Sequence, residues 1–190
     1  MSSDDTLDSF AATARLVGAE GRGIVGVIAT AYGCPFEGPV DPARVARMAA
    51  RLVDAGAEEV ILADTIGVAV PSEIRRLHDL LDPVLQGRPW GVHLHNTRNT
   101  GYANLAAALD LGASVIDAAI GGLGGCPFAP RATGNIATED VNYLLAREGL
   151  APALDHDRLS ATVDWLAGLM PGRITGQLSR AGWFPQEDAA

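Results

Sequence analysis

Two histidines placed two positions apart are the strongest candidates for metal chemistry in this chain. His93 and His95 fall in the run WGVHLH, which predicts a strand over residues 90–95. Side chains at i and i+2 of a strand point to the same face, with Cα atoms about 6.5–7 Å apart. Two imidazoles so placed can bind one cation, or they can be ordinary core or surface histidines. Their place at the carboxyl end of a parallel strand favours a site.

Polar residues follow other predicted strands. Asp64 ends the run EVILAD, where it can ligate a metal, orient a ligand or act as a base, or can simply order a turn. Asn135 carries an amide oxygen suited to Mg²⁺ or Mn²⁺, although asparagine is also common in turns. Glu139 follows in the first turn of a predicted helix, where an acid also favours the helix dipole.

The run GGLGGCPF contains the chain's most reactive candidate, Cys126. Gly124 and Gly125 allow the backbone to approach a ligand closely, and backbone amides there can bind an anion. Cys126 can serve as a proton donor or nucleophile, or as a small buried hydrophobe. Arg98 and Arg131 are placed to meet a carboxylate or a CoA phosphate, or to remain solvated.

The amino-acid composition excludes some kinds of reaction and partner. The 190 residues carry 23 acidic and 14 basic side chains, and every basic one is arginine. A lysine Schiff base is therefore excluded, and a metal ion is the expected electrophile for a carbonyl intermediate. The net charge of −9 argues against nucleic acid. No apolar run approaches the ~20 residues that span a bilayer, and the acidic opening MSSDDTLDSF is unlike a secretory signal, so we expect a cytoplasmic protein.

The elements that must position these residues alternate along the chain. Apolar runs predict strands at 24–30, 59–64, 90–95 and 115–120. Helical spacing predicts helices at 5–17, from Pro42 to the stop at Gly56, and at 71–85, 101–111, 138–147 and 157–170. This order is typical of parallel βαβ architecture. We expect one α/β domain over 1–190: a partial barrel of about four βα units, with a leading helix, C-terminal helices and an irregular tail from 171. A full eight-unit barrel needs roughly 250 residues.

Together these runs resemble one family. AAIGGLGGCPFAPRATGNIATED is similar to the signature loop of 3-hydroxy-3-methylglutaryl-CoA lyases, and YGCPFEG, ILADTIG and VHLHNT fall in that family's order. The resemblance runs from about residue 5 into the tail and identifies the chain with the carboxyl-terminal half of a TIM-barrel lyase. It implies a metal-dependent retro-Claisen cleavage of 3-hydroxy-3-methylglutaryl-CoA to acetyl-CoA and acetoacetate, as in leucine degradation and ketone-body metabolism.

The same resemblance implies roles for individual residues. His93, His95 and Asn135 match the family's metal ligands, here for Mg²⁺ or Mn²⁺. Cys126 matches the loop cysteine that acts as catalytic acid and base. The acyl-CoA is the expected partner, with Gly124, Gly125 and Arg98 as substrate-binding residues.

Asp64 matches an active-site aspartate near the metal, Glu139 matches an acidic residue behind the site, and we assign both to catalysis. Two departures bear on activity. HNTRNT replaces the HDTYGQ of well-known members, which leaves a related branched 3-hydroxy-acyl-CoA open as substrate. Nothing matches the family's early arginine–aspartate pair, so we expect little turnover by this chain alone. A non-catalytic half barrel that binds metal, acyl-CoA or a partner is the alternative. We expect a homo-oligomer, or pairing with an N-terminal half.

Overall fold

The computed structural model describes residues 2–125 and 134–185. The chain divides into two compact units, Met1–Asp117 and Ala118–Ala190, and each is described by itself. Within the described ranges, no helix combines the length and apolar character needed to cross a membrane.

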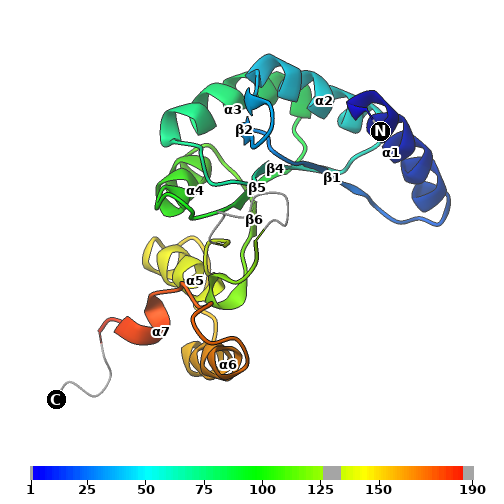
Figure 1. Ribbon diagram of the computed structural model, residues 1–190. Helices are drawn as coiled ribbons and strands as arrows, with labels where there is room; N and C mark the ends of the chain where they lie inside the picture. Colours follow the sequence, from blue (N-terminus) through cyan, green and yellow to red (C-terminus); the bar gives the residue numbers. More distant parts are fainter. Residues whose placement is uncertain (1, 126–133, 186–190) are drawn as a thin grey trace. The chain divides into compact units, whose positions relative to one another are not determined.

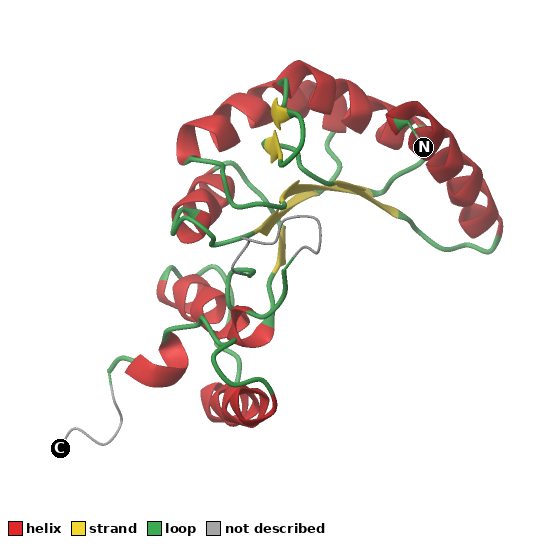
Figure 2. Cartoon of the chain, in the orientation of Figure 1, coloured by secondary structure: helices red, strands yellow, loops and turns green. Residues whose placement is uncertain are grey.

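A four-stranded parallel sheet forms the centre of the first unit (Figures 1 and 2). Its strands, in spatial order, are β1 (Val25–Ile28), β4 (Glu59–Asp64), β5 (Trp90–Leu94) and β6 (Val115–Asp117). Every neighbouring pair is parallel, so the carboxyl ends of all four strands share one edge of the sheet. The register places Asp64 opposite Leu94, and His93 opposite Asp117.

Helices connect these strands and cover one face of the sheet (Figure 1). They are α2 (Pro42–Asp54), α3 (Pro71–Leu85) and α4 (Gly101–Asp110). Helix α2 begins where the Asp41 carboxylate accepts a hydrogen bond from the amide of Ala43, with proline at the first helical position. Its apolar stripe, which includes Val45, Ala49 and Leu52, is buried because that stripe faces the strands.

Three further elements belong to the first unit. Helix α1 (Ser3–Ala19) packs against α2 and precedes the first strand. The segment after β1 contains a small antiparallel pair, β2 (Gly33–Cys34) and β3 (Gly38–Pro39).

The second unit is mostly helical. It contains a short 3₁₀ turn, η1 (Ile120–Gly122), then α5 (Thr138–Arg147), α6 (His156–Leu169) and α7 (Leu178–Ala181). Both α5 and α6 pack against η1, and α7 contacts α5 and α6.

The predicted α/β partial barrel is confirmed, with four parallel strands joined through helices. Strand β4 and helices α3 and α5 have the predicted bounds, and the other predicted elements shift by a few residues. Two expectations were wrong. The loop after β1 contains the β2–β3 pair, and the tail expected to be irregular contains α7, whose first amides are held by the Asp140 carboxylate.

Candidate active site

The two histidines lie together at the carboxyl edge of the sheet. His93 is in β5 and His95 follows the strand directly, and their ring centroids are 5.3 Å apart. His93 is partly exposed, whereas His95 is only 4% exposed. The alternation of the strand therefore places both imidazoles on one face, as predicted from their spacing.

A carboxylate that the sequence analysis did not single out lies beside this pair. The Oδ2 of Asp117, in β6, is 3.4 Å from the Nδ1 of His93. The two residues are register partners in adjacent strands. A carboxylate beside a ring nitrogen typically fixes the orientation of a metal-binding imidazole. The motif VID contained the residue, but only the register of β5 against β6 shows which histidine it meets.

His95 is held in its neutral form. Burial lowers the pKa of its imidazole from 6.5 to about 4, and the neighbouring His93 contributes to the same shift. Its buried Nδ1 has no hydrogen-bond partner among the described residues. A neutral imidazole with a free lone pair is what metal coordination requires, so the His93–His95 pair fits a divalent cation.

Asp64 orders the turn that follows β4. Its carboxyl group is fully buried, and its two oxygens accept hydrogen bonds from the amides of Val68 (2.9 Å) and Ala69 (3.0 Å). Burial raises the pKa of Asp64 above its usual value of 3.8, while these two amides oppose that shift. The carboxylate thus has a structural use within its own loop, whatever further role it has.

Arg98 also acts on this turn. Its Nη1 donates to the carbonyl oxygens of Ile66 and Gly67, each at 2.9 Å. The predicted substrate-binding arginine is therefore engaged with the backbone after β4, although the side chain remains exposed.

In the second unit, Glu139 is buried in the first turn of α5. Its Oε2 accepts a hydrogen bond from the amide of Gly121, and its Oε1 has no partner among the described residues. Burial raises the pKa of this carboxyl group above its usual value of 4.5. Glu139 is thus a first-turn acid of α5, as its position predicted, and it is also fully buried.

Asn135 lies against the glycine-rich segment. Its Nδ2 donates to the carbonyl of Leu123 at 2.8 Å, while its buried Oδ1 has no partner among the described residues. Gly124, at φ +113°, approaches so closely that a Cβ there would lie 2.5 Å from Asn135 Nδ2. The side chain is therefore held by the loop with its oxygen free, which fits a ligand to a hard cation.

The structure shows less about the remaining predicted site residues. Gly125 is exposed beside Gly124. Cys126 and Arg131 lie outside the described residues. The two histidines and Asp64 belong to the first unit, and Asn135, Gly124 and Glu139 belong to the second. Within the described ranges, no three His, Cys, Asp or Glu side chains gather into a metal-binding group.

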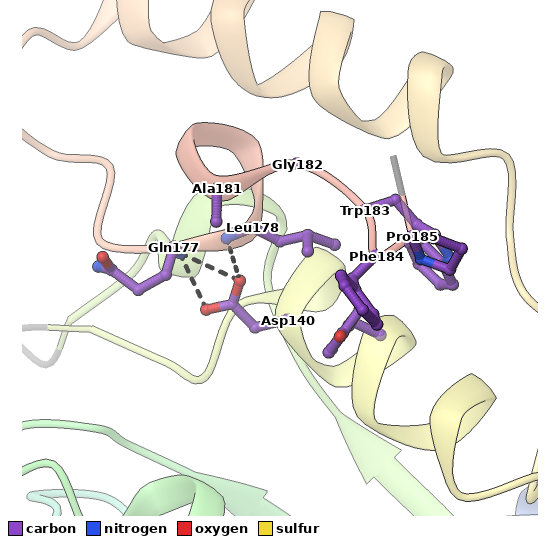
Figure 3. Close-up of a pocket in the computed structure, with 9 residues that line it drawn as sticks. Asp140, Gln177, Leu178, Ala181, Gly182, Trp183, Phe184 and Pro185 are labelled. Carbon is purple, nitrogen blue, oxygen red and sulfur yellow. Dashed lines mark hydrogen bonds between the residues drawn. The ribbon is translucent and has the colours of Figure 1, made fainter. Parts of the chain in front are cut away.

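A cavity of about 580 Å³ lies in the second unit (Figure 3), and one of its lining residues, Asp140, directly follows the predicted Glu139 in the sequence. Among the described residues that line it, Asp140 is the only charged one, and its carboxylate accepts hydrogen bonds from the amides of Gln177 and Leu178. The cavity is otherwise mainly apolar and aromatic; it is lined by Asp140, Tyr143, Gln177, Leu178, Ala181, Gly182, Trp183, Phe184 and Pro185.

The chain is similar to known proteins. The family model described as HMGL-like matches residues 1–165. The (R)-citramalyl-CoA lyase of Chloroflexus aurantiacus is 46% identical over 160 residues, which is 84% of this chain and 50% of that protein. The mitochondrial hydroxymethylglutaryl-CoA lyase of Bos taurus is 36% identical over 181 residues, covering 94% of this chain and 55% of that protein.

Solved structures agree. An HMG-CoA lyase of Acinetobacter baumannii, in complex with coenzyme A and 3-methylmalate, superposes with a TM-score of 0.88 at 34% identity. The match covers 98% of this chain and 61% of that one. The chain thus spans about half the length of the curated relatives it matches. Since the family model covers most of the sequence, the chain belongs to the HMGL-like family.

Proposed function

We propose that this chain carries part of the active site of a metal-dependent carbon–carbon lyase. Its substrate is proposed to be 3-hydroxy-3-methylglutaryl-CoA, cleaved to acetyl-CoA and acetoacetate. The observation that carries the proposal is the His93–His95 pair at the carboxyl edge of the sheet, where sites cluster in parallel folds. Its occurrence in an HMGL-like chain supports the same assignment.

His93 and His95 would hold the divalent cation, Mg²⁺ or Mn²⁺. When bound, such a cation would supply a Lewis acid that lowers the pKa of the substrate's hydroxyl group. Asp117 orients His93, and burial keeps His95 unprotonated and ready to coordinate. Asn135 stays a predicted metal ligand, and its buried Oδ1 has no partner among the described residues.

The other residues are proposed to position groups or move protons. Asp64 holds the turn after β4 through two amides, and Glu139 holds Gly121. Cys126 stays the predicted proton donor to the carbanion that cleavage leaves on the thioester product. Gly124 and Gly125 stay predicted contacts to the substrate, an acyl-CoA. The cytoplasmic localisation, the role in leucine degradation and ketone-body metabolism, and the self-association also stay predictions.

A second substrate follows from one specific observation. The relative named (R)-citramalyl-CoA lyase shares 46% identity with this chain, against 36% for the bovine hydroxymethylglutaryl-CoA lyase. The two acyl groups differ by one methylene between the tertiary carbon and the free carboxylate. A methylene changes discrimination by only about 1–3 kcal/mol, so both substrates belong in one assay.

Metal binding tests the proposal first. We expect Mn²⁺ to bind the purified chain weakly by calorimetry, because only part of a ligand set is present in the first unit. The His93→Ala/His95→Ala variant is expected to lose this binding, while His156→Ala, in α6, keeps it. Equal affinity in the wild type and the double variant would remove the metal assignment.

Turnover tests the reaction. Acetyl-CoA release is measured from 3-hydroxy-3-methylglutaryl-CoA and from citramalyl-CoA, with Mn²⁺ present. We expect slow release by this chain, preferentially from the first substrate, and none from the double histidine variant. Metal binding with no release from either substrate would favour the non-catalytic alternative, and preference for citramalyl-CoA would reassign the substrate.

A further inference from the structure

Arg98 makes an unusual contact for an exposed arginine at an active-site edge. One nitrogen, Nη1, donates to two successive backbone carbonyls, those of Ile66 and Gly67, both at 2.9 Å. Arg98 belongs to the loop after β5, and the carbonyls belong to the turn after β4. A charged donor shared by two carbonyls joins these loops more strongly than a neutral hydrogen bond.

The two loops are also packed without free space. Gly67 has φ +59°, and a Cβ placed there would lie 2.8 Å from the carbonyl oxygen of His95 and 2.9 Å from Cβ of Thr97. The turn after β4 therefore lies directly on the backbone of His95. Any movement of this turn changes the packing around a candidate metal ligand.

The same turn supports Asp64. The amides of Val68 and Ala69 bind its carboxylate, and the amide of Gly67 donates to its carbonyl at 3.1 Å. From α4, the buried Asn104 donates to the carbonyl of Ala69 at 2.8 Å. Three side chains thus hold the segment 66–69. They are Asp64 at the end of β4, Arg98 in the loop after β5, and Asn104 in α4.

We propose that Arg98 is a positioning residue that clasps the turn after β4 onto the loop after β5. It acts through Asp64 and His95, and not by binding the substrate's carboxylate or phosphate. The metal-binding part of this inference rests on the proposed function, whereas the clasp itself does not.

Amide exchange tests the clasp without any ligand. In Arg98→Ala, the amides of Val68 and Ala69 are expected to exchange at least about tenfold faster, since a charge-assisted contact to two carbonyls is lost. Arg98→Lys keeps a charged donor and is expected to recover part of the protection. Arg88→Ala is the matched control, because the Arg88 guanidinium donates to the side chain of Gln86, two positions away, and not to this turn. Unchanged exchange in Arg98→Ala, or an equal increase at Leu52 of α2, would overturn the clasp.

Manganese and coenzyme A binding test how Arg98 acts. With Mn²⁺ followed by its electron paramagnetic resonance signal, Arg98→Ala is expected to weaken binding about tenfold, as losses around metal ligands typically do. Arg98→Lys is expected to recover part of that affinity, which a merely structural role would not require. Unchanged Mn²⁺ affinity together with weakened coenzyme A binding would assign Arg98 to the ligand instead. If the wild type binds no Mn²⁺, the proposed function fails while the exchange experiment still decides the clasp.

Discussion

Two buried carboxylates, one in each unit, are used in opposite ways. Asp64 and Glu139 are both fully buried, and burial raises the pKa of both. Each oxygen of Asp64 accepts a backbone amide, whereas Glu139 uses Oε2 for Gly121 and leaves Oε1 without a partner among the described residues. Burial alone therefore does not show which carboxylate is available for chemistry. The hydrogen bonds that each carboxylate oxygen accepts show it.

The largest effect is expected from Asp64→Asn. An amide nitrogen would replace one acceptor and face a backbone N–H, so a buried donor would be left unpaired. We expect a loss of about 2–4 kcal/mol in the free energy of unfolding, measured by urea denaturation. Asp41→Asn is the matched control, because its exposed side chain also accepts one amide and asparagine caps helices equally well. A loss below that of the control would mean that Asp64 is not needed for the turn.

A middle effect is expected from Gly176→Ala. A Cβ at this position would collide with Oε1 of Glu139 and lie 3.0 Å from Cβ of Ala137. We expect about 1–3 kcal/mol of destabilisation by overpacking, most of it absent when Glu139 is also alanine. Gly168→Ala, in open space on α6, is expected to be neutral or stabilising. An equal loss in both Glu139 backgrounds would contradict the close approach.

The smallest effect is expected from Glu139→Gln, which keeps an acceptor for Gly121 and removes the charge. We expect a change within about 1 kcal/mol near pH 4.5. Because the folded pKa of Glu139 is raised, the wild type loses stability as pH rises from about 4.5 through the folded value. The free energy of unfolding of the glutamine variant is therefore expected to rise relative to that of the wild type over this pH range. Urea denaturation at several pH values measures both. A gap independent of pH would show that Glu139 does not titrate with a raised pKa.

Local sequence patterns predicted the elements well. Asp41 and Pro42 marked the start of α2, and the buried run EVILAD gave β4 within its observed bounds. The β2–β3 pair was missed because two-residue strands carry no alternation that can be recognised. Helix α7 was missed because its start depends on Asp140, which lies far away in the sequence.

The sequence predicted the part of the candidate site that depends on local spacing. It did not predict the contacts between segments that are distant in the sequence. The spacing of His93 and His95 placed both rings together, since strand alternation is a local property. The neighbour of His93, Asp117, needed the register between β5 and β6. The contact of Arg98 with the turn after β4 joins residues about thirty positions apart, so no local pattern could indicate it.

Helix α1 is attached to α2 partly through exposed ion pairs. Its buried side chains are Leu7 and Ala14, and its acidic Asp4 and Asp8 both pair with Arg51 of α2. These ion pairs are exposed, so dissolved salt screens them; the Debye length falls from about 10 Å at 0.1 M to about 3 Å at 1 M. Raising the ionic strength is therefore expected to weaken the attachment of α1 to α2.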